Sequence, residues 1–112
     1  MDGAAELVHG TAIALRIGTG WRAALIRGPS GAGKSDLALR CIAAPQGRLT
    51  PGEVVLIADD QVQVVRRMGR LDASCPPAIR GKLEVRGIGI IDLRTVDTAE
   101  LALIVDLVAR EA

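Results

Sequence analysis

Eight consecutive residues have the pattern G-x-x-x-x-G-K-S of a phosphate-binding loop. They are Gly28, Pro29, Ser30, Gly31, Ala32, Gly33, Lys34 and Ser35. The glycines can adopt backbone angles that point successive N–H groups into one concavity, where phosphate oxygens fit. Lys34 brings a positive charge to the outer phosphates, and the Ser35 hydroxyl can bind the Mg²⁺ that accompanies them. The segment therefore predicts a site for a polyphosphate and its metal ion.

The residues on either side of this loop predict a strand and a helix that would present it. Residues 23–26 form an apolar run that suits a buried strand, and residues 35–44 carry apolar side chains at helical spacing. The first N–H groups and the dipole of such a helix face an anion at its N-terminus. A glycine-rich turn that matches by chance is the alternative, and the fitting flanks count against it.

Two adjacent carboxylates, Asp59 and Asp60, follow the apolar run of residues 54–58. Such a run is typical of a central strand buried on both faces. In proteins with a phosphate-binding loop, a carboxylate at the tip of a neighbouring strand reaches Mg²⁺ or a catalytic water. If the two side chains point in different directions, one can serve the metal while the other takes a proton. A plain turn is the alternative, because Asp is common at strand ends.

Three further residues have types that could contribute chemistry. His9, the only histidine, precedes a predicted strand and is expected at a strand tip, although a satisfied surface histidine is the alternative. Glu84 and Arg86 are two positions apart, so they project on the same side of an extended segment. They could equally form an ion pair on a solvated face. Gly87 and Gly89 beside them indicate that something approaches this segment closely.

The elements that would position these residues are mostly strands. The turn signal of residues 18–20 separates two alternating segments, 11–17 and 21–26, and predicts a hairpin. Two consecutive prolines in residues 73–77 predict an irregular loop. Further predicted strands are residues 54–58, 61–67 and 101–108, and loop signals occur at residues 45–47 and 50–52. Many strands with one clear helix predict an α/β fold with a mixed β-sheet.

Composition excludes several classes of function. The chain has 112 residues, 49% of them hydrophobic, which is enough for one globular domain. Trp21 is the only aromatic residue and the net charge is +1, so neither stacking platforms nor a basic field predict nucleic-acid binding. There is no secretory signal and no apolar run of membrane-spanning length, so a cytoplasmic protein without membrane contact is expected. Cys41 is expected to be a small buried hydrophobe, and neither Cys41 nor Cys75 is expected to have a catalytic or redox role. Lys82 is expected to be solvated charge.

These pieces, in this order, resemble the catalytic domain of HPr kinase/phosphorylase. The matching segments are His9-Gly10-Thr11 before a hairpin, the loop of residues 28–35, the run 57–60, and residues 83–91. The last of these, Leu83-Glu84-Val85-Arg86-Gly87-Ile88-Gly89-Ile90-Ile91, is similar to that family's signature. It weighs more than the loop, which many unrelated enzymes share. The resemblance is to a short form found in some proteobacteria, without the family's usual N-terminal domain.

The resemblance implies an ATP-dependent protein-serine kinase with Mg²⁺ as its metal. Its target would be an HPr-like phosphocarrier of the bacterial phosphotransferase system, and it would reverse the modification by phosphorolysis, taking up phosphate and releasing pyrophosphate. The implied fold is a mixed-sheet P-loop domain resembling the nucleotide-binding part of phosphoenolpyruvate carboxykinase. Family members assemble as hexamers.

The resemblance also implies roles for individual residues. Asp59 would take the serine proton, with His9 close to it, and Arg86 would lie near the transferred group or the partner. Lys34 and the loop amides would hold the β-phosphate. The residues around the metal would be Ser35, Asp60 and Glu84.

The predicted organisation is a single domain over residues 1–112 that lacks the C-terminal helices of longer members. Those helices contact the carrier protein and neighbouring subunits, which counts against a hexamer for this chain. A nucleotide-sensing module that binds ATP without transferring phosphate is therefore the main alternative, although retention of Asp59, Asp60, His9 and Glu84 argues against it. A small-molecule kinase is a second alternative, but such enzymes usually carry more helices and an arginine-bearing lid.

Overall fold

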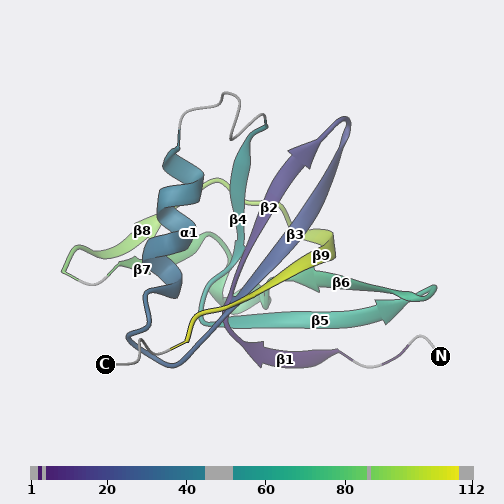
Figure 1. Cartoon of the computed structure of the whole chain (residues 1–112), viewed down its shortest axis with the longest axis horizontal. Helices are drawn as coiled ribbons and strands as arrows, with labels where there is room; N and C mark the ends of the chain where they lie inside the picture. Colours follow the sequence, from purple (N-terminus) through teal and green to yellow (C-terminus); the bar gives the residue numbers. More distant parts are fainter. Residues whose placement is uncertain (1–2, 4, 45–51, 86, 109–112) are drawn as a thin grey trace.

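The computed structural model describes residues 3, 5–44, 52–85 and 87–108. It has one large and one small β-sheet with a single α-helix packed against them (Figure 1). In chain order the elements are β1 (Glu6–His9), β2 (Thr11–Ile17), β3 (Gly20–Arg27), α1 (Lys34–Ala43), β4 (Val54–Ala58), β5 (Gln61–Arg67), β6 (Arg70–Ser74), a 3₁₀ turn (Pro77–Ile79), β7 (Lys82–Val85), β8 (Gly89–Asp92) and β9 (Thr98–Asp106).

The large sheet has seven strands in the order β1-β5-β6-β9-β3-β2-β4. All neighbouring pairs are antiparallel except β3 and β9, which run parallel. The prediction of a mixed sheet is therefore confirmed. The hairpin of β2 and β3 and the fully buried strand β4 also form where the sequence predicted them.

Both faces of the central strands are covered, which explains their small and aliphatic side chains. Alternate residues of β2 point to opposite faces, so Ala12 and Ala14 pack into one buried cluster while Ile13 packs into another. The second cluster includes Ala38 of α1, which is completely buried. The helix therefore covers the face of the sheet that carries Ile13.

The sequence analysis did not predict strands β1 and β6, nor the pairing of β7 with β8 in a separate small sheet. Strand β1 pairs antiparallel with β5. Strand β6 runs through Ala73 and Ser74, so the predicted irregular loop at residues 73–77 is wrong for its first two positions. Both segments are short, which weakens any local pattern. The partner of β1 lies far along the chain, whereas β6 pairs both with the distant β9 and, through a tight hairpin, with β5. The predicted loop residues 45–51 lie outside the described residues.

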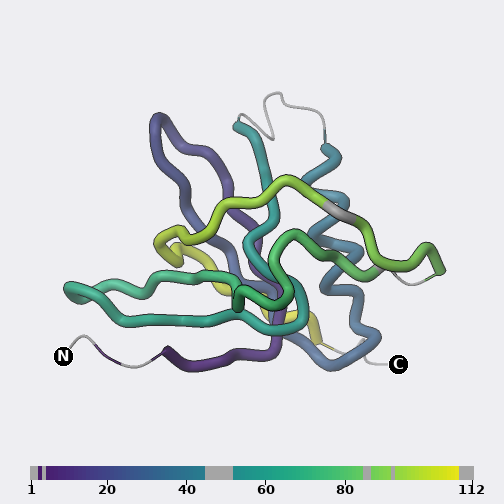
Figure 2. Tube along the Cα trace, turned by 180° about the vertical axis from the view of Figure 1, so that it is seen from behind, coloured from purple at the N-terminus to yellow at the C-terminus, as the bar shows by residue number. Residues whose placement is uncertain are grey.

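The strand directions bring several chain segments together at one end of the large sheet. Strands β1, β3, β4 and β9 all end there, and β2 and β5 begin there. At the opposite end the β5–β6 hairpin extends away from the body of the molecule, as the view from behind shows (Figure 2). The small sheet of β7 and β8 lies beside α1, and its Leu83 is buried against Leu56 of β4.

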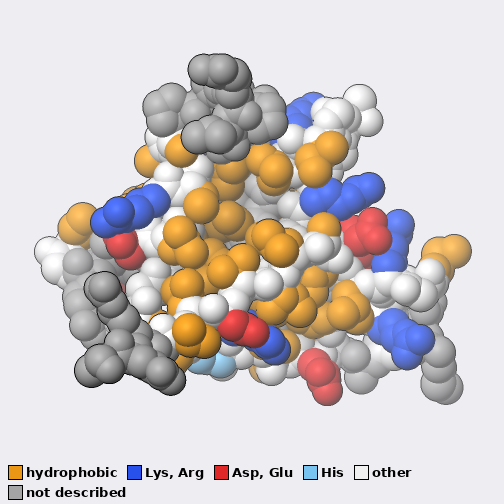
Figure 3. Space-filling view, viewed as in Figure 1, with side chains coloured by type: hydrophobic (Ala, Val, Ile, Leu, Met, Phe, Trp, Pro, Cys, Tyr) orange, Lys and Arg blue, Asp and Glu red, His pale blue; other side chains and the backbone are white. Residues whose placement is uncertain are grey.

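The face flanked by α1 carries many apolar side chains over β3 and β9, with most of the charged groups around them (Figure 3). Two of the exposed large hydrophobic residues, Leu103 and Ile104, belong to β9. Within the described part of the chain, no helix has both the length and the apolar character needed to cross a bilayer.

Candidate active site

A cleft of about 530 Å³ opens where the strand ends meet the first turn of α1. Its walls come from the loop before α1, from the ends of β1 and β4, and from the β7–β8 hairpin beside them. The lining residues are His9, Ser30, Gly31, Gly33, Lys34, Ser35, Asp36, Asp59, Asp60, Ile79, Lys82, Glu84 and Ile90. Most of the residues predicted from the sequence to form the site are therefore on one surface.

The glycine loop, Gly28 to Ser35, connects β3 directly to α1. Gly31 and Gly33 have φ values of 85° and 96°, in the left-handed region that favours glycine. Gly33 is also the N-cap of α1 and has no side chain to cap the helix, and its carbonyl accepts from the Leu37 N–H (2.9 Å). The helix therefore begins with its free N–H groups beside the cleft, which suits an anion.

Lys34 lies inside the loop and is almost completely buried, with 8% of its surface exposed. Its Nζ donates to the carbonyl oxygens of Gly28 (2.8 Å) and Pro29 (3.1 Å). The Ala32 N–H also donates to the Pro29 carbonyl (3.0 Å). The first half of the loop is thus folded around the lysine head group, which places its charge at the floor of the cleft.

Asp59 is the most tightly held carboxylate of the site. Its Oδ1 accepts hydrogen bonds from the hydroxyls of Thr11 (2.8 Å) and Ser35 (2.8 Å). Its Oδ2 accepts from the backbone N–H of Glu84 (3.2 Å). Only 8% of Asp59 is exposed. A buried carboxylate is tolerated when its lone pairs are satisfied in this way.

Asp60 has the opposite environment. It follows the buried strand with a φ of 73°, and the Gln61 N–H bonds back across it to the Asp59 carbonyl (2.9 Å). This tight turn directs the two neighbouring carboxylates to different places. The Asp60 side chain is 74% exposed, and its Oδ1 lies 3.5 Å from Nδ1 of His9. Strained backbone of this kind is often found at functional sites.

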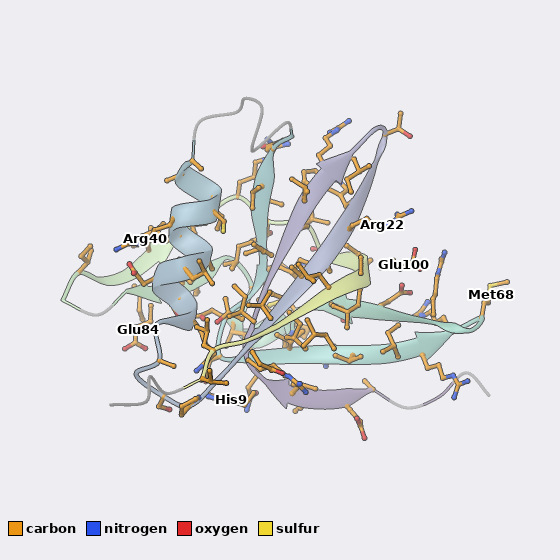
Figure 4. The ribbon with its side chains drawn as sticks, viewed as in Figure 1. His9, Arg22, Arg40, Met68, Glu84 and Glu100 are labelled. Carbon is orange, nitrogen blue, oxygen red and sulfur yellow. The ribbon has the colours of Figure 1, made fainter. Side chains whose placement is uncertain are left out.

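The structure gives His9 a partner that the sequence analysis did not name. The resemblance implies that His9 lies close to Asp59, and both residues line the cleft, while the ion-pair contact of the imidazole is with Asp60. His9 does end a strand, β1, as the sequence predicted, and its side chain points toward the cleft end of the molecule (Figure 4). The reason is the turn at Asp60, which sends the Asp59 side chain inward and leaves its neighbour on the surface.

The β7–β8 hairpin forms the outer wall of the cleft. Glu84 is exposed and lines the cleft on the same side of the molecule as His9 (Figure 4). Lys82, interpreted from sequence as solvated charge, is exposed but also lines the cleft. Ile79 and Ile90, to which the sequence assigned no role, complete this wall. Arg86 lies outside the described residues, so its predicted role remains a prediction.

Thr11 is the functional residue that sequence reasoning missed. It is fully buried, and its hydroxyl is one of the donors to Asp59. The signal was present, because Thr11 completes the His9-Gly10-Thr11 motif, but a threonine at the start of a strand is ordinary. Its role depends on a partner 48 residues away.

The side chains that could hold a metal come from several elements. Within the described ranges, no group of three or more His, Cys, Asp or Glu residues is arranged to hold a metal ion. Mg²⁺ commonly uses only one or two carboxylates together with phosphate oxygens and water. The Ser35 hydroxyl and the neighbouring carboxylates fit such a partial site.

Neither cysteine contributes to the cleft as described. Cys75 is buried, and this burial raises the pKa of its thiol, which opposes a nucleophilic role. Cys41 packs partly buried against the α1 cluster. The expectation that Cys41 is a small hydrophobe therefore fits its surroundings.

The mixed α/β fold places a glycine loop at a helix N-terminus beside two adjacent carboxylates, an arrangement that suits a phosphate group and its metal ion. The particular family follows from comparison with known proteins. The family model described as HPr Serine kinase C-terminal domain matches residues 4–111, and the chain belongs to that family.

Curated relatives of this chain are named HPr kinase/phosphorylase. An HPr kinase/phosphorylase of Bordetella petrii is 44% identical over 73 residues, which are 64% of this chain and 21% of that protein. The HPr kinase/phosphorylase of Cupriavidus metallidurans is 41% identical over 95 residues, 77% of this chain and 27% of that protein. The chain therefore spans about a quarter or less of the length of these relatives.

A solved structure supports the same fold. The Hpr(Ser) kinase/phosphatase from Coxiella burnetii superposes with a TM-score of 0.67 at 27% sequence identity. The match covers 90% of this chain and 58% of the other. The mixed-sheet α/β fold is thus that of an HPr kinase structure.

Proposed function

We propose that this chain is an ATP-dependent protein-serine kinase acting on an HPr-like phosphocarrier, with reversal by phosphorolysis. One observation carries the proposal. Three segments far apart in the sequence, represented by Thr11, Ser35 and Glu84, all donate hydrogen bonds to the single carboxylate Asp59. Together with the segment of residues 57–60 that carries Asp59, these are the four segments on which the resemblance to the family rests. Their meeting at one cleft supports a shared chemical task.

The glycine loop would hold the β-phosphate of ATP. Its free amides and the helix N-terminus suit the phosphate oxygens, and Lys34 would exchange its bonds to the loop carbonyls for bonds to phosphate. Ser35, with one of the neighbouring carboxylates, would hold Mg²⁺, while Glu84 contributes from the opposite wall. When bound, the metal neutralises charge on the transferred group.

The contacts favour exchanging the roles that the resemblance gave to the two aspartates. Asp59 accepts from the Ser35 hydroxyl, so the lone pairs of that hydroxyl stay available to a metal ion in the cleft that both residues line. We therefore place Asp59 on the metal side of the site. Asp60, exposed and paired with His9, is better placed to exchange a proton with a protein substrate.

In the forward direction the serine oxygen would attack the γ-phosphorus as the bond to the β-phosphate oxygen breaks. The serine proton would pass to the Asp60 carboxylate, and ADP would leave. In reverse, an oxygen of inorganic phosphate would attack the phosphorus of phosphoserine. The serine oxygen would then recover a proton from the same carboxylate, and pyrophosphate would leave. One acid/base group suits both directions.

Several finer predictions belong to this proposal. Arg86 would lie near the transferred group or the partner. The likeness to the nucleotide-binding part of phosphoenolpyruvate carboxykinase follows from the family resemblance alone. Family members assemble as hexamers, but the predicted lack of C-terminal helices counts against a hexamer of this chain. A cytoplasmic location is expected from the sequence and remains a prediction. Nucleic acid and membranes are not expected as partners.

The test is intact-mass spectrometry of an HPr-type carrier incubated with this protein and Mg-ATP, then with excess inorganic phosphate. The carrier should gain one phosphoryl group at a serine and lose it as pyrophosphate forms. Asp59→Asn should weaken Mg-ATP binding as well as transfer, whereas Asp60→Asn should keep Mg-ATP binding and lose transfer. Asp72→Asn, on β6, is the control for removing a partly buried carboxylate elsewhere.

Two outcomes would contradict the proposal. ATP binding without any mass change would leave a nucleotide-binding module and exclude the kinase. Normal phosphoryl transfer by Asp60→Asn, with transfer lost in Asp59→Asn, would show that Asp59 is the acid/base group, as the family resemblance implies.

A further inference from the structure

The glycine loop begins where the ends of β3 and β9 lie side by side (Figure 1). Arg27, the last residue of β3, is the register partner of Asp106, the last residue of β9. The guanidinium donates twice to the carboxylate, through Nε to Oδ1 (2.7 Å) and through Nη2 to Oδ2 (2.9 Å). This paired geometry fixes orientation as well as distance.

The backbone reinforces the same junction. The Leu107 N–H donates to the Arg27 carbonyl (2.8 Å), which extends the parallel ladder to the first residue of the loop. A Cβ on Gly28 would lie 3.0 Å from the Leu107 carbonyl oxygen and 3.2 Å from its Cβ. Gly28 is therefore packed closely against Leu107, the residue after β9, where a side chain would fit only if Leu107 moved.

Lys34 holds the same residues from the other side. Its Nζ binds the carbonyls of Gly28 and Pro29. The start of the loop is thus fixed between the end of β9 and the first residue of α1. A shift of Arg27 would therefore also move the Gly28 and Pro29 carbonyls, which position Lys34.

We infer that Asp106 is a positioning residue for the glycine loop, acting through Arg27. The inference rests on the proposed nucleotide site. The side chains of Arg27 and Asp106 are 46% and 53% exposed, so the pair contributes little to global stability. Its hydrogen bonds raise the pKa of Arg27 and lower that of Asp106. We expect the Arg27–Asp106 pair to act instead on the geometry of the glycine loop that follows Arg27.

The chain offers a matched control on the same two strands. Arg22 and Glu100 are also register partners of β3 and β9, with Nη1 and Oε1 3.9 Å apart. They lie at the other end of the ladder, away from His9 and Glu84 (Figure 4). Substitutions there change a β3–β9 ion pair without touching the loop.

The experiment compares Asp106→Asn and Arg27→Lys with Glu100→Gln and Arg22→Lys. Mg-ATP affinity is measured by calorimetry, and amide hydrogen exchange is followed at Leu107 and Ala32 without nucleotide. Asp106→Asn should weaken ATP binding about three- to tenfold, the range expected for an indirect positioning contact. It should also speed exchange at both amides. Arg27→Lys should act in the same direction, because lysine cannot make the paired bonds.

The controls decide between positioning and general support of the sheet. Glu100→Gln and Arg22→Lys should leave affinity and both amides unchanged. Equal losses in the two pairs, or unchanged affinity and exchange in Asp106→Asn, would overturn the inference. If the unmodified protein does not bind Mg-ATP, the proposed function fails, and the exchange rates still decide whether Asp106 holds the loop.

Discussion

The two ends of the large sheet bury very different groups. Among the described residues, the buried polar or charged side chains are Thr11, Lys34 and Asp59, and all three lie at the cleft end. The opposite end carries the turns between β2 and β3 and between β5 and β6, with Ile17 and Met68 exposed. One end therefore contains satisfied buried polarity, and the other contains ordinary surface turns.

The same contrast appears in the backbone. Both ends contain a non-glycine residue with positive φ, Asp60 at the cleft and Met68 in the β5–β6 turn. Met68 and Gly69 form a two-residue hairpin turn, for which positive φ at both positions is normal. Asp60 instead lies between a buried carboxylate and a histidine contact. Unusual backbone therefore indicates function only when its surroundings do.

The largest contrast is expected between two cations. Lys34→Ala should lower phosphoryl transfer about 10²–10³-fold, the range for losing one pre-organised electrostatic donor. Arg16→Ala, at the opposite end, removes a cation 5.5 Å from the Trp21 ring centroid and should leave transfer unchanged. Steady-state kinetics with a phosphocarrier substrate would measure both. Equal losses in the two variants would show that the cleft end has no special role.

A second contrast compares two glycines without positive φ. A Cβ at Gly10 would lie 2.7 Å from the Ile26 carbonyl oxygen, whereas at Gly20 the nearest atom is 4.0 Å away. Gly10→Ala should destabilise the fold by about 3 kcal/mol, the upper end of the range for overpacking, because a backbone atom must move. Gly20→Ala should change stability by no more than about 1 kcal/mol. Urea denaturation would measure both, and comparable values would contradict the close approach at Gly10.

The hydroxyl of Thr11 should have a smaller effect. Thr11→Val keeps the shape of the side chain but removes one donor to Asp59, and should cost about 1.5 kcal/mol, the lower end for a bond to a charged group. Thr11→Ser retains the hydroxyl and should keep nucleotide affinity closer to that of the unmodified protein. Chemical denaturation and calorimetry together separate the two effects. A Thr11→Val variant with unchanged stability and affinity would show that Ser35 and Glu84 hold Asp59 without it.

The smallest effect is expected on the stability that the Arg27–Asp106 pair contributes, when the pH is lowered. The Arg27 hydrogen bonds lower the pKa of Asp106, so the stabilisation from this pair is present above the ordinary carboxyl pKa of about 3.9 and is lost as the pH falls through the lowered value. The difference in urea midpoint between the unmodified protein and Asp106→Asn should therefore be small at neutral pH and shrink below about pH 4. A difference that grows in acid would contradict the assignment, and Glu100→Gln controls for the loss of a β9 carboxylate.

Much of the fold could be predicted because local pattern and burial agree. The continuous apolar run of β4, the alternation of β5 and the turn after Ile17 are each local signals, and all three elements formed as predicted. The glycine loop and α1 were equally clear. Strand β1 was missed because it is short and pairs with residues distant in sequence. Strand β6 is equally short and was missed although its hairpin partner β5 directly precedes it.

The candidate site was predictable as a set of residues but not as an arrangement. Most of the predicted residues line one cleft, while Arg86 lies outside the described residues. The partners of Asp59 and Asp60 could not be assigned, since adjacent residues of one type have the same sequence signal. The contribution of Thr11, the cleft position of Lys82 and the link from Asp106 to the loop were not predicted.

The amino-acid sequence by itself determined the phosphate-loop pattern, the buried strand before Asp59 and the family, because these depend on residue types in order along the chain. Only the tertiary structure decided which carboxylate faces inward and what holds it. The partners of Asp59 lie 48, 24 and 25 residues away. The pairing of β2 with β4, and the packing of α1 and the small sheet beside them, bring these partners within hydrogen-bond distance. Direction and register of strands are properties of the whole sheet, so no local pattern contains them.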